Sequence, residues 1–263
     1  MIVEQIWTGN DFRNFHYLIV CPETGEAMAI DPYDYALCLS VAKDKGWDIT
    51  QILNTHEHFD HIGGNEGLVK ATGAKVLAHK NAKSSIEGMD RGLDAGDVIR
   101  VGRTVELLAL DTPGHTMCHV CLLSKTESPS LFTGDTLFNA GVGHCKYGGH
   151  PRELFRTFES QLWKLDDNTE IYPGHEYISN NLRFTLAREP GNTRAATLLA
   201  EVEDQDLQNP LISTLALEKE INTFFRLQNP NIIANLRESF PDLPEDPDVE
   251  TVFLKLRELR DIW

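Results

Sequence analysis

Short apolar runs bounded by glycine, proline, aspartate or asparagine recur along the first two thirds of the chain, and such runs are typical of β-strands. They predict strands at residues 15–21, 27–31, 49–54, 75–78, 105–109, 120–124, 130–133 and 170–171. Apolar residues at helical spacing predict helices at residues 153–165 and at residues 36–45, where Gly46 provides a stop. This mixture predicts an α+β fold in which two sheets carry helices on their outer faces.

The pattern changes after about residue 178, where strand-like runs disappear and helical spacing takes over. It predicts helices at residues 194–203, 214–225, 230–238 and 249–262. Residues 241–248 are acidic and rich in proline, which is typical of a surface linker. We therefore divide the chain into a first domain of residues 1–177, with strands and helices, and a helical domain of residues 178–263.

Composition narrows the class of protein. The formal net charge of −16 argues against nucleic acid or an anionic membrane as a partner, although a local basic pocket remains compatible with it. No apolar run is long enough to cross a bilayer, and the first residues do not resemble a secretory signal. Five cysteines, an odd number, indicate reduced thiols. We expect a cytoplasmic protein that is a monomer or a weak homo-oligomer and that acts on a small molecule.

Potential metal-binding side chains are most concentrated in residues 55–61, Thr-His-Glu-His-Phe-Asp-His. His56, His58, Asp60 and His61 offer four potential metal ligands within six residues. They follow an apolar run that reads as a buried strand, so they occupy a loop at a strand end where side chains can converge. Imidazole and carboxylate together suit zinc, iron or manganese. A polar loop that is rich in histidine by chance is the alternative, and this density of ligands disfavours it.

Further donors follow other predicted strands. His115 comes after the run at 105–110, Asp135 after the run at 130–133, and His175 after residues 170–171. Each alone is weak, because a single Gly-His is more often a turn than a ligand. Asp31, at the end of another run, could either orient a ligand or cap a turn. Strand ends at one sheet edge can bring all of these side chains together.

Together these segments resemble the metallo-β-lactamase superfamily, whose fold is an αββα sandwich with metals at one edge. The resemblance implies two divalent metal ions per chain, zinc first and iron or manganese as alternatives. It implies catalytic roles for Asp60 and Asp135, with Asp135 bridging the metals. The first metal would be held by His56, His58 and His115, and the second by Asp60, His61 and His175. Asp135 stands where classical β-lactamases carry a zinc-binding cysteine, which disfavours antibiotic hydrolysis.

Within the superfamily the chain is most similar to glyoxalase II, the hydroxyacylglutathione hydrolase family. Residues 174–184, the Glu-Pro-Gly-Asn at 189–192, the helical C-terminal part and the ending Arg-Glu-Leu-Arg-Asp at 257–261 carry this resemblance. It implies that glutathione is contacted by Lys146, Tyr147, Tyr177, Arg257 and Arg260. Lysine and arginine suit its two carboxylates, and Arg257 and Arg260 are neighbours on one helix face. The spacing at 143–149 differs from the family's by about one residue, which weakens the role of Tyr147.

The resemblance implies hydrolysis of S-2-hydroxyacylglutathione, S-D-lactoylglutathione first, to a 2-hydroxy acid and glutathione. Water activated by metal would attack the thioester, and the departing thiol, with a pKa near ~8.5, needs little help from an acid. The alternative is a persulfide dioxygenase with a single iron on His56, His115 and Asp135, but that family usually lacks a long helical C-terminal part. A binding protein without catalysis is the third hypothesis. We expect His16, His79 and His119 to be structural or surface residues.

Overall fold

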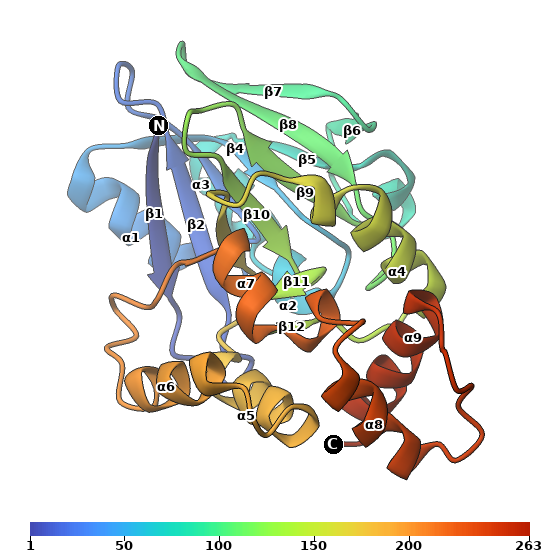
Figure 1. Ribbon diagram of the computed structural model, residues 1–263. Coiled ribbons are helices and arrows are strands. Elements are labelled where there is room, and N and C mark those ends of the chain that lie inside the picture. The colour runs from blue at the N-terminus through green and yellow to red at the C-terminus, as the bar shows by residue number, and fades with distance from the viewer.

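The computed structural model describes residues 1–263 and places two six-stranded sheets face to face (Figure 1). The first sheet runs in the order β1-β2-β3-β4-β5-β6, and the second in the order β14-β13-β10-β9-β8-β7. The first contains β1 (Ile2–Trp7), β2 (Phe15–Val20), β3 (Glu26–Ile30), β4 (Asp48–Leu53), β5 (Lys75–His79) and β6 (Arg91–Leu93). The second contains β7 (Val98–Val101), β8 (Val105–Asp111), β9 (Val120–Ser124), β10 (Ser130–Gly134), β13 (Glu170–Pro173) and β14 (Ser213–Thr214).

The period-two alternation of strand side chains separates two cores. In β2, Tyr17 and Ile19 point between the sheets, where they meet residues of the second sheet such as Phe132. Leu18 and Val20 point the other way, toward the core beneath α1 (Tyr35–Lys45) and α3 (Asn65–Thr72). Because every residue of β2 is buried, the strand is almost entirely apolar in the sequence, with His16 as its one polar residue.

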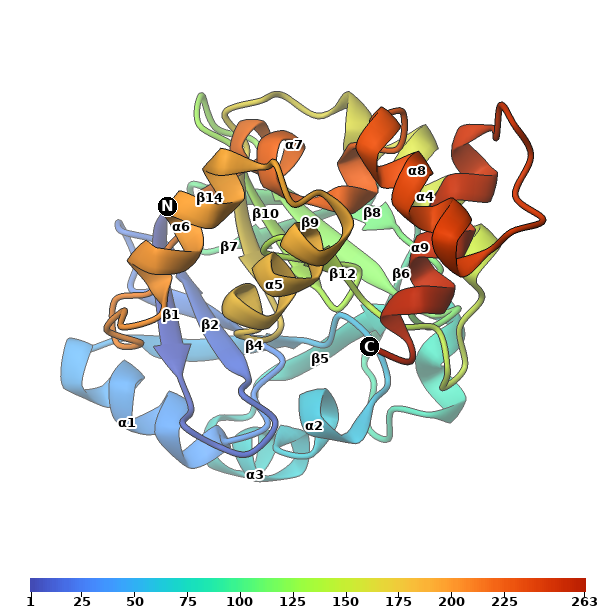
Figure 2. The same cartoon turned by 60° about the horizontal axis from the view of Figure 1, so that its bottom comes forward.

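Helices cover both outer faces and complete an αββα sandwich, as Figure 2 shows. α1 and α3, with the short α2 (Phe59–Ile62), lie on the first sheet. α4 (Pro151–Ser160) and the C-terminal helices lie on the second. The C-terminal helices are α5 (Ile178–Arg188), α6 (Thr193–Val202), α7 (Leu215–Ile221), α8 (Pro230–Ser239) and α9 (Val249–Arg260). The expected fold class is confirmed.

The helices beyond residue 177 share a core with the sandwich. One cluster of 18 buried residues joins Leu131 of β10 and Phe158 of α4 to Phe253 of α9. Strand β14, also from this region, pairs with β13. A shared core does not say which part folds alone, so the division at residue 177 stays a prediction.

All eight expected strands are present, with bounds that differ by one or two residues. The sequence pattern gave no bounds for several further elements. These are strands β1, β6, β7 and β14, the hairpin strands β11 (Leu137–Phe138) and β12 (Gly141–Val142), and helices α2, α3 and α5. The helix expected at 153–165 is α4, which ends at Ser160 and is followed by a 3-10 turn at Leu162–Lys164. The helix expected at 214–225 is divided into α7 and a 3-10 turn at Thr223–Phe225. Residues 241–248 form the expected connection, here between α8 and α9. No helix has the length and apolar character needed to cross a membrane.

Candidate metal centre and substrate pocket

The parallel strands of the two sheets end at a common edge, and this edge gathers the candidate ligands. β3, β4 and β5 are parallel in the first sheet, and β10 and β13 are parallel in the second. His56 and His58 follow β4, and Asp60 and His61 lie on α2 directly after them. The second sheet adds His115 from the β8–β9 loop and Asp135 and His175 from the residues after β10 and β13.

Three imidazoles converge on one point. His58 Nδ1 lies 3.1 Å from His56 Nε2 and 3.0 Å from His115 Nε2. Their ligand atoms all lie within 4.8 Å of one another. All three residues belong to the set expected for the first metal.

A second group lies beside the first. His61 Nε2 is 3.2 Å from His175 Nε2, and Asp60 Oδ2 is 3.5 Å from the former and 3.4 Å from the latter. Asn14 Nδ2 donates to Asp60 Oδ2 at 3.2 Å, which holds the carboxylate toward the two rings. This is the set expected for the second metal.

Asp135 lies between the two groups. Its Oδ2 is 3.5 Å from His115 Nε2 and 3.3 Å from His175 Nε2, while its Oδ1 is 3.5 Å from His61 Nε2. The carboxylate is almost fully buried, and its Oδ1 accepts no hydrogen bond. A buried anionic oxygen without a partner is costly, so its position between two imidazole groups indicates a place for cations.

Hydrogen bonds behind the rings orient them. Asp31 Oδ2 accepts from His61 Nδ1 at 3.0 Å and from the hydroxyl of Thr55 at 2.6 Å, and the Thr55 oxygen in turn faces His56 Nδ1 at 3.0 Å. His115 Nδ1 donates to the His144 carbonyl at 2.7 Å. When Nδ1 carries the proton, Nε2 is free to bind a metal, and such outer partners commonly fix the tautomer of histidine ligands.

His175 has the same arrangement, because its Nδ1 donates to the carbonyl of Phe12 at 2.8 Å. Asp31, His56 and His61 also form a possible ligand group by proximity alone. The Asp31 oxygens are already engaged with Thr55 and His61 Nδ1, however, on the side of the rings away from Asp135. Of its two expected roles, Asp31 therefore has the geometry of the one that orients a ligand.

The electrostatics favour neutral rings at His56 and His115 and an anionic carboxylate at Asp135. Burial lowers the pKa of His115 to about 3 and holds the pKa of His56 well below its ordinary value. Burial also lowers the pKa of His61, but the carboxylates of Asp135 and Asp31 outweigh it and raise that pKa to about 9. Burial raises the pKa of Asp135, yet the imidazoles of His175 and His61 hold it well below its usual range.

This donor set fits the metal ions that the fold implies. Neutral imidazole and ionised carboxylate are the forms that bind divalent metals, and the unpartnered oxygen of Asp135 lacks only a positive partner. The acidic surroundings that raise the pKa of His61 equally favour a cation beside its ring. The seven side chains form two donor groups, three histidines on one side and two histidines with Asp60 on the other, with Asp135 between them.

A pocket of about 240 Å³ opens beside the centre and contains four of the five expected substrate residues. Lys146 Nζ, at its rim, donates to the Asp261 carbonyl at 2.8 Å. Arg260 Nη2 donates to Asn181 Oδ1 at 3.2 Å. The pocket is lined by Phe138, Val142, His144, Lys146, Tyr177, Asn181, Arg257, Arg260, Asp261 and Trp263.

Arg257 differs from the other cations of the pocket because its guanidinium is buried. Its Nη1 donates to the carbonyls of Val142 and Gly143 at 2.8 and 3.0 Å, and its Nη2 pairs with Asp261 at 3.0 Å. It therefore ties α9 to β12 while it contributes charge to the pocket. Tyr147 is not among the lining residues, and its side chain is 69% exposed.

The sequence did not single out Phe138, Asn181 or Trp263 as pocket residues. Asn181 Nδ2 also donates to the Asn139 carbonyl at 2.9 Å, so it joins α5 to the β11–β12 hairpin. The only available signal was the resemblance of residues 174–184, which contain Asn181 without distinguishing it. Phe138 and Trp263 come from distant parts of the chain that only the folded core brings together.

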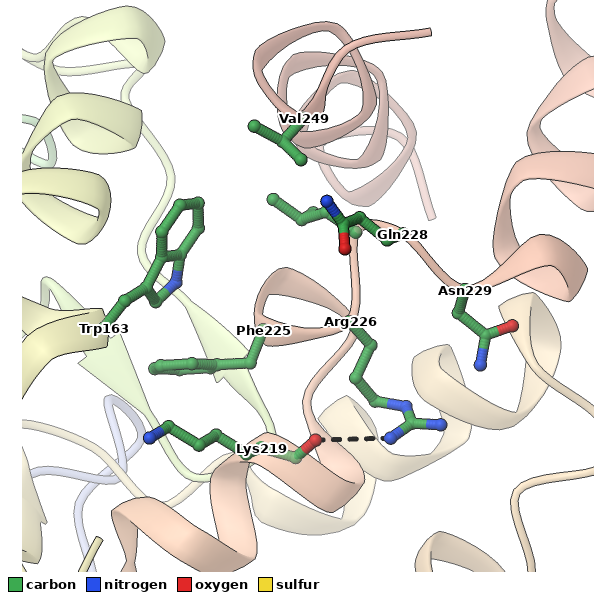
Figure 3. A pocket seen from close by; sticks show the side chains of 8 residues that line it. Trp163, Lys219, Phe225, Arg226, Gln228, Asn229 and Val249 are labelled. Carbon is green, nitrogen blue, oxygen red and sulfur yellow. Dashed lines mark hydrogen bonds between the residues drawn. The ribbon is translucent and has the colours of Figure 1, made fainter. Parts of the chain in front are cut away.

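A second hollow of about 410 Å³ lies between α7, α8 and α9, away from the metal ligands, and Figure 3 shows its lining. Its two cations already have anionic partners. Lys219 pairs with Asp167, and Arg226 forms two hydrogen bonds of 2.7 Å to Glu189. Arg226 also donates to the Lys219 carbonyl, the dashed line of Figure 3. With its charges paired internally, this hollow offers little to recognise a charged ligand.

The fold and the site define a class that comparison with known families supports. Residues 21–175 match the family model of the metallo-beta-lactamase superfamily, whose members bind divalent metals, and the chain belongs to this superfamily. The remainder, residues 176–263, matches the family model described as the hydroxyacylglutathione hydrolase C-terminus. Two curated relatives extend the match to the whole chain. Both are named hydroxyacylglutathione hydrolase, and one from Polaromonas sp. is 63% identical and one from Nitrosococcus oceani 62% identical, over 100% of both lengths in each case.

The chain is therefore a member of the hydroxyacylglutathione hydrolase family, and the expectations of that family and of a hydrolase are confirmed. Among solved structures, that of ETHE1 from Myxococcus xanthus has a TM-score of 0.68 and is 24% identical, and it covers 98% of this chain and 99% of its own. At that identity the likeness shows the fold alone.

Proposed function

We propose that this chain hydrolyses S-2-hydroxyacylglutathione thioesters, with S-D-lactoylglutathione the first candidate, to a 2-hydroxy acid and glutathione. The full-length relatives at 62–63% identity carry the corresponding name. The C-terminal family match covers the helices that form one side of the pocket. The seven candidate ligands converge, and they would supply the site at which the thioester reacts.

One observation carries the proposal: the cationic pocket and the candidate metal centre share a wall. The ring of Tyr177, which lines the pocket, stacks on His175 with centroids 5.0 Å apart and an angle of 5°. Phe138 packs edge-on against both rings, at 5.9 Å from His175 and 5.2 Å from Tyr177. A glutathione moiety held in the pocket would place its thioester beside the histidine cluster.

The pocket suits glutathione by charge. Glutathione carries two carboxylates, and the pocket lining has three cations, Lys146, Arg257 and Arg260, against one carboxylate, Asp261, which pairs with Arg257. This excess of positive charge lies within a protein whose formal net charge is −16. The loop that contains Lys146 is also fixed to the centre, because the His144 carbonyl accepts from His115 Nδ1 and the His144 ring accepts from the Lys146 backbone N–H. We include Tyr147 as a weaker candidate, since its exposed side chain lies outside the pocket.

We propose two divalent ions per chain, zinc first, with iron and manganese as alternatives that the same donors suit. Ions bound here would lower the pKa of water from about 15.7 toward ~7 and so supply a nucleophile. Asp60 and Asp135 are the proposed catalytic carboxylates, because both face the histidine nitrogens at 3.3–3.5 Å. The leaving group is a thiol with a pKa near ~8.5, which needs little help from an acid.

The test combines elemental analysis of the purified protein with an assay of thiol release from S-D-lactoylglutathione. We expect two metal ions per chain and rapid release. The same lactoyl thioester on a small thiol without carboxylates should be a much poorer substrate, mainly through KM. Metal-replete protein that releases no thiol from lactoylglutathione would contradict the proposal, and oxygen uptake with glutathione persulfide would support the mononuclear iron alternative instead. We also propose a cytoplasmic monomer or weak homo-oligomer, which sedimentation and fractionation can test.

A further inference from the structure

His119 directly precedes β9, and its side chain is completely buried. Its ring stacks on that of His56 with centroids 5.2 Å apart and an angle of 19°. It also lies edge-on to His115, with centroids 6.3 Å apart, but it belongs to none of the possible metal-ligand groups. The sequence predicts only a structural or surface role for it.

Both ring nitrogens of His119 have partners, and these partners fix its tautomer. The backbone N–H of Asp135 can only donate, and it points to His119 Nε2 at 3.3 Å. Nε2 therefore carries no proton, and Nδ1 carries it. Two hydroxyl oxygens accept on that side, Thr112 Oγ1 at 2.9 Å and Thr136 Oγ1 at 3.2 Å.

The turn that His119 supports is the one that aims Asp135. Gly134 has φ of +46°, and a Cβ there would lie 2.9 Å from His119 Nε2 and 2.4 Å from Thr55 Oγ1. The Thr136 N–H closes the turn on the Thr133 carbonyl at 3.0 Å. His119 thus packs against the backbone of this turn and accepts its central N–H, while the Asp135 carboxylate on the other side faces both histidine groups.

We propose that His119 is a positioning residue for the metal-bridging carboxylate. It holds the 133–136 turn through the Asp135 N–H and so sets the direction of the Asp135 side chain without binding metal itself. This role rests on the proposed two-metal centre. If His119 were purely structural, its substitution would lower the free energy of unfolding, but it would weaken metal binding no more than any other substitution that destabilises the protein equally.

Three variants separate the two roles. His119→Gln keeps an acceptor, because its Oε1 can occupy the position of Nε2 and receive the Asp135 N–H. His119→Asn reaches only the position of Nδ1 and leaves that N–H without a partner. His79→Leu is the control. His79 is another buried histidine, at the end of β5, and its side chain contacts Asn81 and Asp111 rather than the ligands.

For each protein we would measure zinc affinity by competition with a chelator, the thermal midpoint of the metal-free form, and kcat and KM. We expect His119→Asn to lose about 10–100-fold in metal affinity, the usual effect of removing a partner behind a ligand. His119→Gln should recover most of that loss. At saturating zinc, His119→Asn should lower kcat and leave KM near the wild-type value, because the glutathione pocket is intact. His79→Leu should lower the thermal midpoint without changing metal affinity.

Equal metal affinities for His119→Asn and His119→Gln would overturn the positioning role. So would a loss of metal affinity in His79→Leu as large as that in His119→Asn, if the two variants have the same thermal midpoint. These comparisons need no catalysis. A wild-type protein that binds two zinc ions but does not hydrolyse lactoylglutathione would therefore contradict the proposed function. The role of His119 would still be tested, because the metal affinities of its variants can be compared without catalysis.

Discussion

Asp31 offers the sharpest test of the metal centre, because one carboxylate orients a ligand from each group. Its Oδ2 accepts from His61 Nδ1 directly and from the Thr55 hydroxyl, whose oxygen faces His56 Nδ1. Its Oδ1 accepts the Thr55 backbone N–H at 2.8 Å. In Asp31→Asn the amide oxygen can keep this last bond, but an NH₂ group replaces Oδ2 and faces two donors.

The cost can be estimated from these contacts. To avoid two opposed donors, His61 would move its proton from Nδ1 to Nε2, the nitrogen that faces His175 and Asp60. Loss of one charge-assisted hydrogen bond costs about 1.5–3 kcal/mol, and removal of such an outer partner commonly lowers metal affinity about 10–100-fold, which is about 1.4–2.7 kcal/mol. The two estimates agree. Asparagine also tolerates the φ of +50° at this position, so backbone strain does not confuse the result.

The assay is chelator competition with zinc, followed by elemental analysis of the protein. Asp44→Asn is the control, because it makes the same chemical change at an exposed position of α1. We expect Asp31→Asn to bind zinc roughly 10–100-fold more weakly than the control. Unchanged zinc affinity in Asp31→Asn would refute the argument that this carboxylate sets the histidine tautomers.

Four further outcomes follow from the structure. Gly174→Ala should weaken metal binding, because its Cβ would lie 2.4 Å from Asp135 Oδ1. Gly191→Ala is the control, because its Cβ would meet nothing within 4 Å. Equal metal affinities of the two variants would contradict this prediction. Lys146→Ala should raise KM roughly tenfold, the loss of one charge-assisted hydrogen bond, with a smaller change in kcat, and steady-state kinetics would show the reverse if Lys146 acts in the chemical step. Burial lowers the pKa of His16 from 6.5 to about 4, so the unfolded chain binds this proton more tightly than the folded one. The free energy of unfolding should therefore fall by about 3 kcal/mol as the pH drops from 6.5 to 4. Denaturant unfolding of His16→Gln at several pH values should lack this contribution to the pH dependence. Chelation should abolish hydrolysis and lower the thermal midpoint, and added zinc should restore both; a midpoint insensitive to chelator would mean that the metals do not stabilise the fold.

The sequence by itself determined the strands that carry the chemistry. Buried strands such as β2 and β9 are almost entirely apolar, and this local signal does not depend on partners. Each candidate ligand lies in the loop after a strand or on the helix after one, so its place at the sheet edge could be expected from chain order. The family resemblance then supplied the grouping of the ligands and the expected substrate.

Edge strands and polar helices were harder to predict. β1 and β7 are only partly buried, so their patterns are not continuously apolar. β14 has two residues and exists because the chain passes beside β13. In α5, a stretch with two adjacent asparagines becomes a helix because Asn181 is buried against the β11–β12 hairpin.

Only the tertiary structure decided which groups lie behind the ligands. Asp31, His119 and the carbonyl of Phe12 contact the metal residues across separations that no local pattern encodes. The structure also distinguished the arginines of α9, since Arg257 is buried against β12 whereas Arg260 faces Asn181 in the pocket. The physical reason is that strand formation depends on neighbours in sequence, whereas the orientation of a buried polar group depends on the donors and acceptors that packing of the two sheets brings to it.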